Sequence, residues 1–214
     1  MDSKNQETQE NLDWPALGRY RKENHELSSI VNSGKRIIFM GDSITEGWTG
    51  LYPGFFENKD HINRGISGQT TPQMLIRFKP DVIDLQPSTV AILAGTNDIA
   101  ENTGPSNVKM ITDNIFSMAD LAYAHKIKVI LCSVLPVDKY PWKKISDPPS
   151  FIYEVNTMLK DYCLNKNYKY IDYFSQMVNE KKGLDESLSE DGVHPNEKGY
   201  AVMSRVAETI LYSK

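Results

Sequence analysis

The chain has 214 residues, of which 40% are hydrophobic and 24% are charged, and its formal net charge is −4. This length and composition predict one globular domain with its own core, because no interior stretch rich in proline, glycine or serine marks a linker. The mixed charges argue against nucleic acid as a partner, and no apolar run approaches the roughly 20 residues that cross a membrane.

The amino-terminal segment, residues 1–13, is polar and lacks the charged and apolar regions of a signal peptide. We expect a disordered tail there, followed by a single domain over residues 14–214. The chain as given fits a cytoplasmic protein. A polar start of this kind also remains after a signal peptide has been removed, so a periplasmic or secreted protein fits as well.

The predicted elements alternate between helices and short buried strands. Helices are predicted from Asp13–Pro15 to Ser33–Gly34, with Leu17, Tyr20, Leu27 and Val31 on one face, and over residues 48–56, 70–78, 105–124, 150–165 and 196–211. Five apolar runs are typical of strands buried on both faces, at residues 36–40, 61–63, 89–93, 128–133 and 168–171. Only two cysteines are present, Cys132 in a strand and Cys163 in a helix, which predicts neither a disulfide framework nor a zinc site.

This alternation predicts an α/β fold in which a five-stranded parallel sheet is covered by helices on both faces. We expect the flavodoxin-like strand order 2-1-3-4-5. In such sheets the ligand site lies beyond the carboxyl ends of the strands, near the point where the strand order reverses. Polar, glycine-containing segments follow the first three strands and precede the last helix: Gly41–Thr45 (GDSIT), Asn63–Gly68 (NRGISG), Ala94–Asp98 (AGTND) and Asp191–Pro195 (DGVHP).

These segments contain the residue types that acyl transfer requires. Ser43 follows a strand directly, at the start of a turn where its hydroxyl is exposed, and Gly41 would allow the sharp bend. His194 and Asp191 are three residues apart, so one compact turn can join the carboxylate to one imidazole nitrogen while the other faces Ser43. The pattern predicts a nucleophile, a base and a residue that orients the base.

Acyl transfer also needs hydrogen-bond donors for the oxyanion that forms on the carbonyl. The backbone N–H of Ser43 is one candidate. Gly68 has no side chain to block approach, so its N–H is a second, and the Asn97 amide is a third. Each residue also has a structural explanation, since Asn favours turns and Gly permits a positive φ.

With these motifs, the sequence resembles the SGNH/GDSL hydrolase superfamily, whose four blocks match GDSIT, RGISGQT, GTND and DGVHPN. It is similar to bacterial acylhydrolases that resemble platelet-activating-factor acetylhydrolase, and to carbohydrate acetyl esterases. The resemblance implies a three-layer α/β/α sandwich, no cofactor and no metal. Ile44 stands where the family has leucine, a conservative change. A G-x-S-x-G pentapeptide is absent, which argues against an α/β-hydrolase.

Other polar residues compete for these roles. Three histidines, His25, His61 and His125, lie in helix-like or strand-like contexts and suit structural roles. Asp172 follows the fifth strand, where it would organise a turn. For Asp42 and Asp98 we expect hydrogen bonds to loop backbone, and for Arg64 a salt bridge in the wall of the site.

The connection over residues 137–149 (VDKYPWKKISDPP) is long for such a unit and should overhang the site. Tyr140 and Trp142 in it could stack on a sugar ring, with Trp48 and Tyr52 forming the opposite wall. The alternative is that these aromatic residues pack the loop onto the body of the protein. No segment suits an interfacial lid.

The sequence therefore predicts a cofactor-free serine esterase that hydrolyses short acyl esters, with acetylated carbohydrates as the substrate class. A lysophospholipase or thioesterase is the alternative among enzymes. A non-catalytic, flavodoxin-like carbohydrate-binding module is the alternative from another class, and an ordered triad argues against it. A nucleotide-binding protein would require a phosphate-binding glycine motif, which the chain lacks.

Overall fold

A computed structural model describes residues 13–30, 32, 34–58 and 60–213. Its centre is a five-stranded sheet in the order β2-β1-β3-β4-β5, with every neighbouring pair parallel. The strands are β1 (Ile37–Gly41), β2 (His61–Gly65), β3 (Thr89–Leu93), β4 (Lys128–Cys132) and β5 (Lys169–Ile171). The predicted α/β class and strand order are confirmed.

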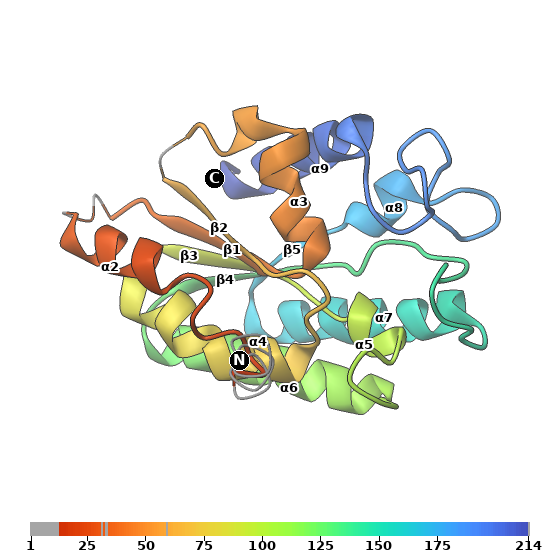
Figure 1. Ribbon diagram of the computed structural model, residues 1–214, viewed down its shortest axis with the longest axis horizontal. Helices are drawn as coiled ribbons and strands as arrows, with labels where there is room; N and C mark the ends of the chain where they lie inside the picture. The colour runs from red at the N-terminus through yellow and green to blue at the C-terminus, as the bar shows by residue number, and fades with distance from the viewer. Residues whose placement is uncertain (1–12, 31, 33, 59, 214) are drawn as a thin grey trace, which may run out of the picture.

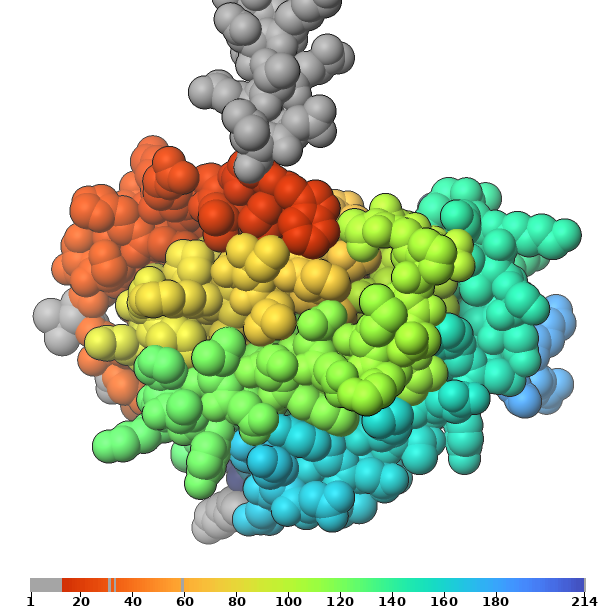
Figure 2. Space-filling view, turned by 90° about the horizontal axis from the view of Figure 1, so that it is seen from below, coloured from red at the N-terminus to blue at the C-terminus, as the bar shows by residue number. Residues whose placement is uncertain are grey.

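Helices cover both faces of the sheet (Figure 1). One face carries α3 (Ser43–Leu51), α8 (Tyr173–Met177) and α9 (Glu197–Leu211). The other carries α4 (Thr71–Asp81), α6 (Val108–Ala124) and α7 (Pro148–Lys166), with α2 (Arg21–Ser29) beside α4. Figure 2 shows this second face, where residues 13–30, α4, α6 and α7 follow one another across the surface. The three-layer sandwich is therefore present.

The three central strands, β1, β3 and β4, are largely buried on both faces because their side chains alternate between two apolar clusters. In β1, Ile38 and Met40 pack with the α4, α6 and α7 layer. Ile37 and Phe39 point to the opposite cluster, beneath α3 and α9. This arrangement explains why the central strands appear in the sequence as apolar runs, whereas the edge strands β2 and β5 contain polar residues and are partly exposed.

Two helices differ from their prediction, and two short ones were not predicted. The first is shorter and begins at Arg21, because turns occupy residues 14–20, where Asp13 accepts hydrogen bonds from the N–H groups of Leu17 and Gly18. The helix expected over residues 48–56 begins at Ser43 instead and ends at Leu51, followed by a 3-10 turn, Pro53–Phe55. Two short helices, α5 (Thr96–Ile99) and α8, were not predicted.

Part of the prediction lies outside the described residues, namely residues 1–12 of the expected tail together with Val31 and Ser33 of the first helix. Within the residues that the structure does describe, no helix combines the length and the apolar character needed to cross a bilayer.

Candidate active site

Ser43 is the first residue of α3, not part of an irregular turn. The preceding residue, Asp42, caps the helix by accepting the Ile44 N–H at 2.9 Å. Gly41 is required by crowding rather than by a positive φ, because a Cβ at this position would lie 2.0 Å from Thr45 Oγ1 and 2.9 Å from the Leu93 carbonyl oxygen. Ser43 thus combines the end of a central strand with a helix amino terminus, where free N–H groups favour negative charge.

The other two residues of the predicted triad meet Ser43. His194 Nε2 lies 3.0 Å from Ser43 Oγ, and its Nδ1 lies 2.7 Å from Asp191 Oδ2. These distances are within hydrogen-bond range. Because the Asp191 carboxylate accepts a hydrogen bond from Nδ1–H, the neutral imidazole presents an unprotonated Nε2 to the Ser43 hydroxyl. The structure therefore brings together a nucleophile, a base and an orienting carboxylate from residues 151 positions apart in sequence.

The turn that carries His194 is open to solvent and held by local contacts. The side chains of His194 and Asp191 are 39% and 42% exposed. Asp191 Oδ1 accepts the N–H groups of Val193 at 2.9 Å and His194 at 2.8 Å. Ser189, which is buried, bonds the His194 carbonyl at 2.7 Å and accepts the Gly192 N–H at 3.0 Å. These hydrogen bonds hold the turn in place, although the side chains of His194 and Asp191 remain open to solvent.

Partial burial acts to raise the pKa of Asp191, but hydrogen bonds outweigh it. The His194 side chain and the backbone N–H groups of His194 and Val193 stabilise the carboxylate, and the pKa falls to about 2. Asp191 is consequently ionised at any pH at which an esterase would be assayed, as an orienting residue must be.

The candidate oxyanion donors lie next to one another. Gly68 has φ +75°, so its backbone requires glycine. Asn97 is buried at the amino terminus of α5, and its Nδ2 donates to the Gln69 carbonyl at 3.1 Å. The Ile66 N–H donates to the Gly41 carbonyl at 3.1 Å, which holds the Gly68 turn beside the segment containing Ser43. The predicted donors thus belong to loops in direct contact.

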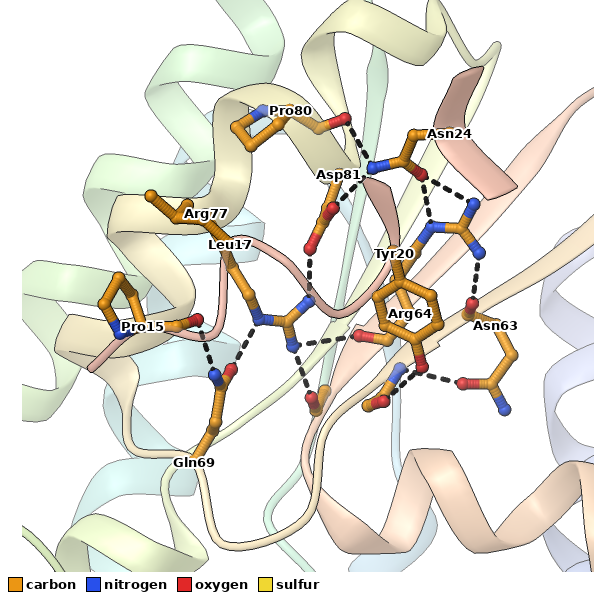
Figure 3. A network of polar contacts seen from close by, with 12 residues as sticks. Pro15, Leu17, Tyr20, Asn24, Asn63, Arg64, Gln69, Arg77, Pro80 and Asp81 are labelled. Atoms are coloured by element: carbon orange, nitrogen blue, oxygen red, sulfur yellow. Dashed lines mark hydrogen bonds and ion pairs between the residues drawn. The ribbon is translucent and has the colours of Figure 1, made fainter. Parts of the chain in front are cut away.

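A buried arginine, not predicted, lies beneath this edge of the sheet (Figure 3). Arg77 of α4 is fully buried and pairs with Asp81 at 2.9 Å. One of its nitrogens donates to the carbonyl oxygens of Gly41 and Arg64, each at 2.9 Å. Another donates to the Gln69 side chain. One guanidinium therefore joins the ends of β1 and β2 to the loop that carries Gly68.

Asp42 and Asp98 have the structural roles predicted for them. Asp98 accepts the N–H and hydroxyl of Thr71, so it joins the third polar segment to α4. Burial raises the pKa of Asp42 to about 7, and burial raises that of Asp98 to about 6 against the opposing hydrogen bonds. Asp42 Oδ2 is buried and finds no hydrogen-bond partner among the described residues.

Arg64 forms a different contact from the predicted salt bridge. Its guanidinium donates to the amide oxygen of Asn24 at 2.8 and 3.0 Å and lies 4.5 Å from the centre of the Tyr20 ring. The Tyr20 hydroxyl in turn donates to the Gly65 carbonyl (Figure 3). Asn24 and Tyr20 thus replace a carboxylate as the partners of this arginine.

The proposed aromatic wall is wrong for Trp48 and Tyr52. Trp48 is 1% exposed, is stacked on Phe55 and donates its indole N–H to Ser204. Tyr52 follows the carboxyl end of α3, roughly 13 Å along the helix axis from Ser43 at 1.5 Å per residue. The prediction failed because it started this helix after Ser43, whereas the helix carries both side chains away from the site.

The two aromatic residues of the 137–149 connection have different environments. Tyr140 is 5% exposed and its hydroxyl lies 3.0 Å from Thr96 Oγ1, so its ring cannot stack on a ligand. Trp142 is 47% exposed, and the centre of its ring lies 6.0 Å from that of His194. Of the four predicted aromatic contacts, only Trp142 has both an exposed ring and a place beside the triad.

The competing residues take structural positions. His61 is buried between the Phe55 carbonyl and the Tyr212 hydroxyl, and His125 bonds the Leu121 carbonyl at a helix end. Asp172 caps α8 by accepting the Ser175 N–H at 3.0 Å.

Four residues at the site were missed by sequence reasoning: Gln69, Arg77, Asn102 and Ser189. Gln69 and Ser189 lie within or next to the four polar segments, so position alone could have suggested them. Arg77 could not be found in this way, because the sequence does not distinguish it from Lys79, an exposed cation on the same helix.

Comparison with known proteins identifies the family of this chain. Residues 39–202 match the GDSL-like lipase/acylhydrolase family. A GDSL-like lipase from Bacteroides thetaiotaomicron is 45% identical, with a TM-score of 0.89 over 92% of this chain and 97% of the other. A candidate acylhydrolase from Bacteroides fragilis is 44% identical, with a TM-score of 0.90 over 92% and 96% of the two chains.

More distant relatives include named esterases. An arylesterase from Vibrio mimicus is 26% identical over 182 residues, which are 79% of this chain and 84% of the relative. An acetylxylan esterase from Geobacillus stearothermophilus is 28% identical over 92 residues, 42% of its length. A lipoprotein from Bacillus subtilis is 35% identical over 83 residues, which are only 34% of its length. By the match over residues 39–202, this chain is a carboxylic ester hydrolase of the GDSL-like lipase/acylhydrolase family.

Proposed function

We propose that the protein hydrolyses short acyl esters through an acyl-enzyme intermediate on Ser43. The observation that carries the proposal is the continuous hydrogen-bonded relay from Ser43 Oγ to His194 to Asp191, with contacts of 3.0 and 2.7 Å. The position of Ser43 at a helix amino terminus supports the proposal further, because backbone N–H groups there can donate hydrogen bonds to a developing negative charge and stabilise it.

In the first half-reaction Ser43 Oγ attacks the acyl carbon while its proton passes to His194 Nε2. The N–H groups of Ser43 and Gly68 and the Asn97 amide stabilise the oxyanion. When the ester bond breaks, the imidazolium returns the proton to the leaving alcohol. In the second half-reaction His194 deprotonates a water that attacks the acyl-Ser43 ester, and the proton then returns to Ser43 as the acid leaves.

Replacement of the nucleophile tests the reaction. Ser43→Ala should lower turnover of p-nitrophenyl acetate by about four to six orders of magnitude. Ser117→Ala, which removes a hydroxyl far along α6, serves as the matched control and should be fully active. Mass spectrometry of the enzyme quenched during turnover should find an acetyl group on the peptide that contains Ser43. Undiminished hydrolysis by the Ser43 variant would refute the proposal.

For the substrate we propose acetylated carbohydrates. Two facts support this choice: an acetylxylan esterase is among the relatives, and an exposed indole lies beside His194. A ring face of this kind suits the apolar face of a sugar. The same position could also receive the leaving group of another ester, so acyl length and alcohol have to be tested independently.

A panel of esters separates the alternatives. Acyl chains from acetyl to decanoyl on one alcohol, and acetyl on sugar, aryl and thiol acceptors, should give the highest kcat/KM for acetylated oligosaccharides. A preference for long acyl chains or for lysophospholipids would favour a lysophospholipase, and a preference for acyl thioesters a thioesterase. Trp142→Ala should raise KM for the oligosaccharide more than for p-nitrophenyl acetate, and an equal effect on both would contradict stacking.

A further inference from the structure

The amide of Asn97 can serve the oxyanion only in one of its two orientations. One N–H of its Nδ2 donates a hydrogen bond to the Gln69 carbonyl at 3.1 Å, which leaves the second N–H for a ligand. If the amide turned by 180°, its oxygen would face the Gln69 carbonyl and the site would present an acceptor to the oxyanion. The orientation of a buried side chain with 3% exposure is therefore decisive for catalysis.

A second amide fixes this orientation. Asn102 Nδ2 donates to Asn97 Oδ1 at 2.8 Å and reaches the Gly68 carbonyl at 3.4 Å. Asn102 is itself exposed, and its own amide could turn. Trp142 prevents this, because its indole nitrogen donates to Asn102 Oδ1 at 3.3 Å. An indole is a donor only, so it requires the oxygen of Asn102 on its side.

The two ends of this chain of hydrogen bonds give it one direction. It begins at a group that can only donate, the Trp142 indole, and ends at a group that can only accept, the Gln69 carbonyl. The same region is held by further contacts. Three side-chain pairs fasten residues 140–143 to residues 96–102, namely Tyr140 with Thr96, Trp142 with Asn102, and Lys143 with Glu101.

From this geometry we infer that Asn102 is a positioning residue that fixes the Asn97 amide for the oxyanion, and that Trp142 sets its direction from the 137–149 connection. The inference rests on the proposed oxyanion role of Asn97. It gives Trp142 a function in catalysis that is separate from any contact with a sugar, and it links the loop that would meet the substrate to the oxyanion hole.

The variants Asn102→Ala and Asn102→Asp test the inference. With p-nitrophenyl acetate, Asn102→Ala should lower kcat about tenfold with little change in KM, as expected for the loss of one orienting hydrogen bond. Asn102→Asp has the same shape but cannot donate to Asn97, and its charge opposes the oxyanion, so kcat should fall about a hundredfold. Lys109→Met removes an exposed ion pair with Asp113 on α6, outside this region, and should leave kcat unchanged.

A double-mutant cycle separates positioning from general damage. Asn97→Ala alone should lower kcat about 10²- to 10³-fold. If Asn102 acts through Asn97, adding Asn102→Ala to that variant should cost no more than about twofold further. Multiplicative losses, or full activity of Asn102→Ala, would overturn the inference even when Ser43→Ala is inactive. An active Ser43→Ala would instead refute the proposed function itself.

The indole N–H has its own test. Trp142→Phe keeps an aromatic face and removes the donor, so kcat for p-nitrophenyl acetate should fall about two- to fivefold while KM for an acetylated oligosaccharide stays near that of the wild type. Trp142→Ala should give the same fall in kcat together with a higher KM for the oligosaccharide. A Trp142→Phe enzyme with unchanged kcat would show that the indole does not set the direction of the hydrogen bonds from Asn102 to Asn97.

Discussion

The two sides of the active site are built in opposite ways. The oxyanion side, made of the loops around Gly68 and Asn97, stands on a buried network centred on Arg77. The base side is a single turn, residues 189–194, whose catalytic side chains are 39% and 42% exposed. The network joins distant parts of the chain, whereas the turn is held by bonds between residues at most five positions apart.

This difference follows from the task of each side. Stabilising an oxyanion needs fixed donors in a site with little water, since a dipole that is already oriented does not have to reorganise during the reaction. A general base has to exchange protons with the leaving alcohol and with water, and a solvent-exposed turn permits this. We therefore expect damage on the base side to affect rate, and damage to the buried network to affect folding.

Among the changes that compare the two sides, the largest effect should come from Asp191→Asn on the base side. The amide would reverse the preference for the Nδ1–H tautomer, so Nε2 would be protonated and unable to accept from Ser43. We expect kcat to fall about 10³- to 10⁴-fold, with a change in unfolding free energy below about 1 kcal/mol because the group is exposed. Asp172→Asn is the control and should be active. A large loss of stability in the Asp191 variant would contradict the expectation that changes on the base side affect rate rather than folding.

On the buried side, Arg77→Met should lower the free energy of unfolding by about 3 to 5 kcal/mol, because Asp81 would remain buried without its cation. Urea unfolding monitored by circular dichroism measures this. Lys79→Met on the same helix removes an exposed lysine from Asp84 and should cost less than about 1 kcal/mol. Equal losses would mean that the buried pair contributes no more than a surface pair.

The sequence predicted the parts of this design that depend on local chemistry. Short apolar runs predicted the three central strands and shorter mixed runs predicted the two edge strands. The polar segments after the first three strands and before the last helix predicted Ser43, Gly68, Asn97 and the Asp191–His194 turn as candidate site residues. Burial of individual polar and aromatic residues could not be predicted in the same way. Whether Arg77, Trp48 or Tyr140 faces the core depends on helix starts and loop paths, and Gly47 and Gly50 obscured the start of α3.

A third effect concerns the pH dependence of stability. Burial raises the pKa of Asp42 to about 7, above the value of about 3.9 for an unfolded aspartate. The folded protein therefore holds a proton that the unfolded chain releases, so stability should fall as pH rises from about 4 to about 7.

Asp42→Asn keeps an oxygen that can cap α3 but cannot ionise. Between pH 4 and 7.5 the unfolding free energy of the wild type should decline relative to that of the variant by roughly 1 to 4 kcal/mol. Parallel pH profiles would mean that Asp42 is already ionised in the folded protein at low pH, and so that its buried oxygen has a partner.

The smallest effect should come from Ser189→Ala, which loosens the exposed turn and removes a 3.2 Å hydrogen bond to Asp191 Oδ1 but replaces no residue of the triad. The hydroxyl holds both the His194 carbonyl and the Gly192 N–H, and its loss should cost about 1 kcal/mol. Because His194 would sample positions away from Ser43, kcat for p-nitrophenyl acetate should fall about three- to tenfold. Ser187→Ala, which removes an exposed hydroxyl two residues earlier that bonds only Asp185, should leave kcat unchanged. If both variants lost activity equally, the position of His194 would depend on the whole 185–194 segment rather than on the hydrogen bonds of Ser189 in particular.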